Sequence, residues 1–352
     1  PAPTMMKSKF NCTGKFSLFS LTYFRVFQLE TNPFYSIKEL LNSYGLIRIM
    51  QDSLCSAIKI FFSEIQPEPK RVFHGRGQLF PEYSHVCLDW YPPVVFVSAY
   101  EPIGNLVELL AWLRKMDKPC QIQTIMLQKR YEKNSPAELL YGEDKTRVIV
   151  EENGLKFETL LGKQQNTGLF LDMQPLRVWL KGNSAGKKLL NLFSYTCTLS
   201  VAALAGGARS AVNVDLSKTS MRWGERNHDL NGQDKDLITS LPFNVFTSWG
   251  RIKQEGRYDL VIIDPPTYQR NSFSAERDYR AVLKKMRSIC SDEATIIAAL
   301  NSPFLDEQFL LDKFERHVPK AKFVELMAAA PEFLDRFPER ALKIFRFEFS
   351  SE

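Results

Sequence analysis

The residues best placed to do chemistry lie at the end of an apolar run, within Tyr258–Tyr268 (YDLVIIDPPTY). Asp264 follows the apolar residues, which predict a buried strand, and Pro265 and Pro266 come next. Two consecutive prolines lack backbone donors and fix φ, so they favour a rigid turn with free carbonyl groups, and Tyr268 lies just beyond it. Asp264 and the Pro265 carbonyl can accept hydrogen bonds from the amine of a flat base held in this turn. The alternative is an ordinary exit from a strand.

The segment Lys188–Ser217 predicts one βαβ unit. Its second strand ends on Asp215, about 20 residues past the first turn, and an acid at this spacing binds the ribose hydroxyls of a nucleoside in doubly wound folds. The first turn has Ser194, Thr196 and Cys197 where a pyrophosphate-binding turn has glycines, and these side chains would crowd a dinucleotide. The unit therefore favours a nucleoside cofactor that carries no phosphate.

Several motifs, in the correct order along the chain, resemble a known family. The acid-Pro-Pro-aromatic turn is the signature of S-adenosylmethionine (AdoMet) methyltransferases that act on nitrogen in a planar group. Together with it, the sequences FSYTCTLSVAALAGGA, VNVDLS and NHDLNG resemble the bacterial large-subunit (23S) rRNA methyltransferases that form 5-methylcytosine or 7-methylguanine. Residues 151–177 are similar to that group's β-hairpin and to its loop that closes over AdoMet. The resemblance covers roughly residues 73–347 and implies AdoMet as the cofactor.

This resemblance also implies roles for individual residues. Asp215 would bind the ribose hydroxyls, Leu216 would pack on the adenine, and the turn Phe193–Thr196 would form the floor under the methionine moiety. Asp172 and Arg177 would approach the amino and carboxylate ends of AdoMet, and the amide oxygen of Asn244 would accept a bond from the adenine amine. The target base would be held by Asp264, Pro265, Pro266 and Tyr268. The complete expected cofactor set is Asp172, Arg177, Phe193, Ser194, Tyr195, Thr196, Asp215, Leu216, Ser217, Asn244 and Val245.

The chain as a whole predicts an α/β protein with three regions. Residues 163–352 are expected to form a Rossmann-like class I methyltransferase domain with a mostly parallel sheet, because apolar strands alternate with helices. Those strands are predicted at 189–193, 211–215, 258–264, 295–300, 323–327 and 341–349. Residues 70–162 are expected to form a smaller α/β domain on the substrate side, with strands at 94–98 and 123–128 and a helix at 106–114 between them. It ends in a hairpin over 147–161 with Asn153-Gly154 at its turn. Residues 1–69 would be an N-terminal extension with a helix over 37–65 and a linker at 66–70.

Net charge, apolar content and cysteine spacing indicate which partners and cofactors the chain can have. The 352 residues carry a net charge of +6 and are 44% hydrophobic, which suits a globular protein with a polyanionic partner. No apolar run reaches the ~18 residues that a membrane span requires, so we expect no membrane association. The six cysteines are scattered without a CxxC pair, which argues against a zinc site and for the reducing cytoplasm.

Three basic segments are candidates for RNA contact, and each has a plainer interpretation. Lys129-Arg130-Tyr131 combines charge with an aromatic ring suited to stacking on single-stranded RNA, but it can also be a solvated strand end. Arg270 and Arg277 follow the DPPTY turn, where they would either bind RNA or form a solvated helix face. His74-Gly75-Arg76-Gly77 could grip a phosphate or be an ordinary loop.

The choice of target atom depends on a cysteine. Methylation at cytosine C5 requires a thiolate that adds to C6. In the resembling 5-methylcytosine enzymes this cysteine follows a late strand, here the one that ends within 297–303, and that segment has no cysteine. Cys290 precedes this strand and Cys197 lies in the cofactor turn. We therefore expect methylation of a base nitrogen, which needs alignment but no covalent adduct.

The sequence thus predicts a cytoplasmic AdoMet-dependent methyltransferase that acts on RNA, on a 23S rRNA base by the resemblance. Two alternatives stay open. The first is a methyltransferase of a protein side chain or a small molecule, because such turns also bind planar amides. The second is a non-catalytic RNA-binding assembly factor, against which Asp215 and Asp264 both speak.

Overall fold

The computed structural model describes residues 54–352 except 267 and 270–272. Most of the expected extension, residues 1–53 of 1–69, lies outside the described residues. Of the helix expected over 37–65, the described part is α3 (Leu54–Phe61). Leu54 and Ile58 of α3 pack into the core of the smaller domain. The expected linker is also fastened to that domain, because the Trp90 indole donates to the Gln66 carbonyl at 2.8 Å.

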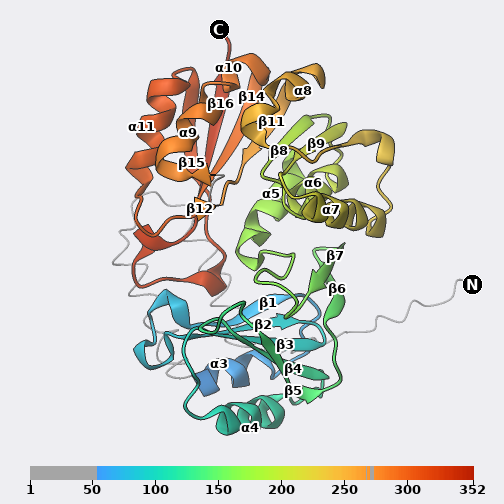
Figure 1. The fold of residues 1–352 in the computed structure, drawn as a ribbon, viewed down its shortest axis with the longest axis vertical. Helices are drawn as coiled ribbons and strands as arrows, with labels where there is room; N and C mark the ends of the chain where they lie inside the picture. Colours follow the sequence, from blue (N-terminus) through green and yellow to red (C-terminus); the bar gives the residue numbers. More distant parts are fainter. Residues whose placement is uncertain (1–53, 267, 270–272) are drawn as a thin grey trace, which may run out of the picture. The chain divides into compact units, whose positions relative to one another are not determined.

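The smaller domain is built on a five-stranded sheet with the order β1-β2-β3-β4-β5 (Figure 1). Only β3 and β4 are parallel, and the helix α4 (Leu106–Met116) connects them as the sequence predicts. The strands β1, β2 and β5 were not expected. The bounds are β1 (Lys70–His74), β2 (Val86–Tyr91), β3 (Val94–Ala99), β4 (Thr124–Lys129) and β5 (Ala137–Gly142), with the short helices η1 (Gly75–Gly77) and η2 (Pro81–Tyr83) between β1 and β2.

The expected hairpin is present as β6 (Arg147–Glu152) and β7 (Leu155–Leu160). Its two-residue turn has φ of 51° at Asn153 and 75° at Gly154. A two-residue turn with positive φ at both positions matches the twist of paired strands, and Asn-Gly is the sequence that adopts it most readily. This hairpin was therefore predictable from local sequence alone.

The larger domain is a doubly wound, Rossmann-like α/β fold with a seven-stranded sheet ordered β10-β9-β8-β11-β14-β16-β15. All strands run parallel except β16, which is antiparallel to both of its neighbours. The six expected strands are confirmed, and the short, half-buried edge strand β10 was missed. The bounds are β8 (Lys188–Leu192), β9 (Ser210–Val214), β10 (Ile238–Leu241), β11 (Tyr258–Ile263), β14 (Cys290–Leu300), β15 (Ala321–Leu326) and β16 (Lys343–Ser350).

Helices cover both faces of this sheet, so alternate residues of each strand pack into two separate hydrophobic cores, one on each face. Leu189 packs in a core with side chains of α5 and α6, and Leu190 packs in the opposite core with side chains of α8, α9, α10 and α11. The remaining bounds are η3 (Leu171–Met173), α5 (Gln174–Asn183), α6 (Thr198–Ala205), α7 (Lys218–Leu230), η4 (Lys235–Leu237), η5 (Val245–Thr247), α8 (Trp249–Gln254), β12 (Tyr268–Gln269), β13 (Phe273–Ser274), α9 (Ala275–Leu283), α10 (Met286–Ile289), α11 (Glu307–His317), η6 (Pro331–Phe333) and η7 (Pro338–Arg340). Across the described ranges, none of the helices combines the length and apolar character that a bilayer crossing needs.

Candidate active site

The residues that follow the parallel strands meet in one cavity of about 510 Å³. In doubly wound sheets, ligands bind beyond the carboxyl ends of the strands, and this cavity lies there. The turns after β8, β9 and β11 contribute Phe193, Ser194 and Tyr195, then Asp215, Leu216 and Ser217, then Asp264, Pro265 and Pro266. The two motifs that stand far apart in the sequence therefore line the same space.

The turn after β8 has an unusual backbone. Phe193, Tyr195 and Cys197 have φ values of 61°, 48° and 60°, a left-handed conformation that side chains other than glycine seldom adopt. The amide of Ser194 donates to the Val214 carbonyl at 3.1 Å, and this bond ties the turn to the neighbouring strand. Left-handed residues of this kind persist where the surroundings hold them, and they concentrate at ligand sites. The turn after β8 therefore adopts left-handed backbone conformations at three residues that are not glycine.

Asp215 is held by two backbone amides. Its Oδ2 accepts from the amide of Tyr195 at 2.9 Å and its Oδ1 accepts from the amide of Ser217 at 2.8 Å. Burial raises the pKa of Asp215, and these two hydrogen bonds oppose that rise. The carboxylate therefore joins the two turns and still lines the cavity, where ribose hydroxyls can reach its remaining lone pairs.

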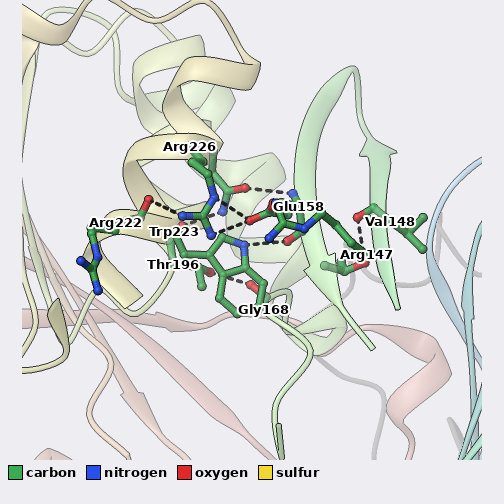
Figure 2. Close-up of polar contacts among 10 residues, drawn as sticks. Arg147, Val148, Glu158, Gly168, Thr196, Arg222, Trp223 and Arg226 are labelled. Atoms are coloured by element: carbon green, nitrogen blue, oxygen red, sulfur yellow. Dashed lines mark hydrogen bonds and ion pairs between the residues drawn. The ribbon is translucent and has the colours of Figure 1, made fainter. Parts of the chain in front are cut away.

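A chain of hydrogen bonds connects the hairpin to the turn after β8 (Figure 2). The amide of Glu158 donates to Asn227 Oδ1 at 2.9 Å, and Asn227 Nδ2 donates to the Thr196 carbonyl at 2.8 Å. Thr196 Oγ1 then donates to the Gly168 carbonyl at 2.5 Å. Gly168 precedes the cavity residue Phe170, so these bonds fix the loop that leads into η3. Thr196 is only 1% exposed and supports the cavity from behind rather than lining its floor as expected.

The same hairpin docks on α7 through a buried acid. Glu158 pairs with Arg226 at 2.7 Å and with Arg147 at 2.8 Å, and its carbonyl accepts from the Trp223 indole at 3.1 Å (Figure 2). Asn231 also exchanges two hydrogen bonds with the backbone of Lys156. The asparagines of the NHDLNG motif are thus explained by the docking of β7 on α7.

Two further carboxylates face the cavity, Asp172 from η3 and Asp264 from the end of β11. Burial, and then the charge of Asp172, raise the pKa of Asp264 to about 7. Burial likewise raises the pKa of Asp172, against the opposing charges of Arg71 and Arg177. In the part of the chain that the structure describes, the lining contains these two acids and Asp215 but no lysine, arginine or histidine. Such a lining fits a cationic ligand, and AdoMet carries a sulfonium and an ammonium group.

Arg177 lies outside the cavity lining, so its expected approach to the cofactor carboxylate stays a prediction. The structure places it on α5, where its Nε and Nη2 donate to the two oxygens of Glu152 at 2.6 and 2.8 Å. Both side chains are at most 2% exposed, and Arg177 does not line the cavity. A buried guanidinium needs a carboxylate partner, and the hairpin supplies one.

Asn244 and Leu216 do line the cavity, as does Val245. The amide oxygen of Asn244 accepts from the Phe246 amide at 2.8 Å, so the atom expected to receive the adenine amine already caps η5. Leu216 is 49% exposed, a large value for an apolar side chain, and its role against the adenine stays a prediction.

The expected RNA-contact residues lie outside this cavity. Lys129 forms an ion pair with Glu138 at 2.9 Å, and Arg277 pairs with Asp278 at 2.8 Å. Arg130 follows β4, and its amide donates to the carbonyl of Ala99 at 2.7 Å. Arg270 lies outside the described residues, and the backbone of Tyr268 belongs to β12.

Ten residues of the cavity lining were not expected from the sequence. Asn301 was the easiest to find, because it directly follows a correctly predicted parallel strand. Leu342 had no such signal, since it precedes the antiparallel strand β16. The full missed set is Gln165, Asn166, Phe170, Met173, Thr198, Leu199, Ser220, Phe246, Asn301 and Leu342.

The doubly wound sheet, the ribose-type acid and the acidic cavity define a nucleoside-cofactor enzyme. Residues 70–348 match the family described as S-adenosylmethionine-dependent methyltransferase, and the chain belongs to that family. AdoMet is therefore the cofactor. Its contacts with Asp215, Asp172 and the turn after β8, which all line the cavity, stay a prediction. When bound, AdoMet supplies the methyl group.

Relatives with known names support this assignment. Ribosomal RNA large subunit methyltransferase K of Neisseria meningitidis serogroup B is 31% identical over 269 residues, which cover 75% of this chain and 70% of that protein. Ribosomal RNA large subunit methyltransferase K/L of Hahella chejuensis is 30% identical over 238 residues, covering 63% of this chain and 32% of that protein. The chain spans about a third of the length of the K/L relatives.

Solved structures agree with the fold. A Streptococcus mutans protein described as a SAM-dependent methyltransferase superposes with a TM-score of 0.71 and 26% identity, covering 84% of this chain and 80% of that chain. The protein SMU.776, described as a methyltransferase complexed with SAH, gives a TM-score of 0.71 and 27% identity over 82% of this chain and 77% of that chain.

Proposed function

We propose that this enzyme methylates a nitrogen of a base in large-subunit ribosomal RNA, and that it acts in the cytoplasm, where that RNA is assembled. The names of the relatives support the RNA substrate. The rigid Asp264-Pro265-Pro266 turn beside the cofactor cavity supports a flat target. The net charge of +6 is compatible with a polyanionic partner.

The observation that carries the choice of nitrogen is that no cysteine among the described residues lines the cavity. Cys197 is 1% exposed, and burial raises the pKa of its thiol to about 12. Cys290 begins the 11-residue strand β14, while the cavity lies beyond its other end. Cys290 pairs with Tyr258 at the start of β11, and Asp264 follows six residues later, roughly 20 Å away at about 3.3 Å per residue. Neither thiol is placed or ionised to attack C6 of a pyrimidine.

Without a covalent adduct, the enzyme has to align the target nitrogen with the methyl group of AdoMet. In its ionised form Asp264 accepts a hydrogen bond from the target amine, and the Pro265 carbonyl accepts a second. These bonds hold the base so that a nitrogen lone pair points at the sulfonium methyl group. Holding two reactants in this geometry supplies much of the rate enhancement of such a transfer. Pro265 is buried, so packing against the protein interior holds the turn that presents both acceptors.

The test is nucleoside mass spectrometry of large-subunit RNA from a strain that lacks this gene. We expect one N-methylated nucleoside to disappear, to return with the wild-type gene, and not to return with Asp264→Ala. The matched control Asp292→Ala changes an exposed acid at the opposite end of β14 and should restore the nucleoside. Loss of a 5-methylcytosine would refute the nitrogen assignment. Unchanged RNA together with loss of methylation on a protein or small molecule would refute the RNA substrate.

A further inference from the structure

The motif His74-Gly75-Arg76-Gly77 contains the end of β1 and all of η1, and it presents one arginine to solvent. A Cβ on Gly75 would lie 1.9 Å from the Tyr83 carbonyl oxygen, and one on Gly77 would lie 2.1 Å from the Leu334 carbonyl oxygen. Both glycines are therefore required by close backbone packing. Arg76 between them is exposed, and its guanidinium carbon lies 4.3 Å from the centre of the Tyr100 ring.

A second group of arginines lies on one ring in the segment 331–340. The guanidinium carbons of Arg340 and Arg336 are 4.4 and 5.6 Å from the centre of the Phe337 ring. Both arginines are exposed. A guanidinium that lies over an aromatic ring keeps its N–H edge free for phosphate, and its planar form suits stacking on a base.

These two groups adjoin each other and the cofactor cavity. The amide of Arg336 donates to the Gly77 carbonyl at 2.6 Å, so the segment 331–340 is hydrogen-bonded to η1. Two residues beyond Arg340, Leu342 lines the cavity. We call Arg76, Arg336 and Arg340 the arginine face.

No described carboxylate neutralises the arginine face. Throughout residues 54–352, apart from the four that the structure does not describe, no carboxylate forms an ion pair with its three guanidinium groups. The segment does contain acids, but Glu332 pairs with Lys70 at 3.6 Å and Asp335 accepts from the Phe337 amide at 2.7 Å. Glu339 is the third and is exposed. By contrast, Lys129 and Arg277 both have carboxylate partners.

We propose that the arginine face binds an unpaired RNA strand that flanks the target base. This inference rests on the proposed RNA methyltransferase function and names the surface that function would use. Arginines over aromatic rings stack on bases and contact phosphates, whereas in a duplex the base faces are already stacked. The face would therefore hold the strand on either side of the base that enters the turn at Asp264.

The first experiment measures binding of a mixed-sequence single-stranded RNA oligonucleotide, and of the same strand annealed to its complement, across a salt series. The triple variant Arg76→Gln, Arg336→Gln and Arg340→Gln should bind the single strand about tenfold or more weakly. Its log–log salt slope should fall by about 2, as expected for three lost phosphate contacts on a single strand. Its affinity for AdoMet should be unchanged, which shows that the fold is intact.

A matched triple variant carries Arg257→Gln, Arg287→Gln and Arg316→Gln, three exposed arginines of the larger domain. It removes the same charge and should bind the single strand as the wild type does. An equal loss in this control would overturn the proposal, because net charge alone would then explain binding. Equal loss of duplex and single-strand binding in the first variant would overturn the preference for an unpaired strand.

A lysine version of the arginine face separates charge from stacking. It should restore the salt slope but not the full affinity, because an ammonium cannot stack as a guanidinium does. Full restoration would refute the stacking role. Methylation of large-subunit RNA separates the RNA-binding role of the arginine face from the proposed RNA methyltransferase function. If the wild-type enzyme methylates RNA and the glutamine variant binds and methylates it equally well, only the role of the arginine face is refuted. A wild-type enzyme that methylates no RNA would overturn both.

Discussion

The protonation of Asp264 should control methyl transfer near neutral pH. Its pKa is raised to about 7, first by burial and then by the charge of Asp172. An ionised carboxylate is a stronger acceptor for the target amine, and a protonated carboxyl would present an O–H donor in its place, so the rate should rise as pH rises through this pKa. For a pKa of about 7 the ionised fraction rises from roughly one-eleventh at pH 6 to roughly ten-elevenths at pH 8, about tenfold.

The assay is the initial rate of methyl transfer with AdoMet and RNA both far below saturation, because this condition reports the ionisation of the free enzyme. Replacing Asp172 by asparagine removes the neighbouring charge but not the burial. The acid limb of the profile should therefore shift to lower pH without returning to the range of an exposed aspartate. Asp292→Asn, at an exposed site outside the cavity, should leave the profile unchanged.

A rate that is flat between pH 6 and 8 would refute the requirement for ionised Asp264. An acid limb that does not move in Asp172→Asn would refute the electrostatic coupling of the two acids. Stability supplies an independent check with the opposite sign. Because the folded state holds this proton more tightly than the unfolded state, the contribution of Asp264 to stability is greatest below its ordinary pKa of 3.8 and decreases as pH rises to about 7.

Three further predictions concern the cofactor turn and the target atom. Asp215→Ala should weaken AdoMet binding by about 1.5–3 kcal/mol in calorimetric titration, the range for hydrogen bonds to a charged group, and an unchanged dissociation constant would remove Asp215 from the site. Gly168→Ala should weaken AdoMet binding and lower the unfolding temperature, because Gly168 has φ of 98° and its new Cβ would lie 2.1 Å from the Trp223 ring. Gly182→Ala meets nothing within 4 Å and should be neutral or stabilising. RNA containing 5-fluorocytosine should form no covalent adduct, and Cys197→Ser should retain most of the rate; an adduct that this substitution removes would show a C5 enzyme.

Local patterns predicted the parts of the fold whose signals are local. The turn at Asn153-Gly154, the strand before Asp264 and the βαβ unit ending at Asp215 all depend on residues within about 30 positions, and each is where the sequence placed it. The edge strand β10 was missed because it has only four residues and the middle two, Thr239 and Ser240, are polar. Because Asp215 and Asp264 each follow a parallel strand, the sequence also predicted that both lie at the carboxyl edge of the sheet.

The position of Arg177 could not be predicted from the sequence, for a different reason. The resemblance of residues 151–177 to a loop that closes over AdoMet implied a cofactor contact, but the carboxylate partner of Arg177 is Glu152 of the hairpin, 25 residues earlier. A pairing of this kind depends on how the hairpin docks on α5, and no periodic pattern encodes it. The role of Thr196 was hidden in the same way, because its partner Gly168 is brought near by tertiary structure.

The charge of the cavity lining bears on cofactor exchange between turnovers. Asp172, Asp215 and Asp264 surround a space with no described basic side chain, so in their ionised forms they would attract the sulfonium of the incoming cofactor. Methyl transfer abolishes that positive charge, and the spent cofactor becomes net neutral while the carboxylates stay in place. The same lining that draws in fresh cofactor therefore holds its product less tightly, which favours release and the start of the next cycle.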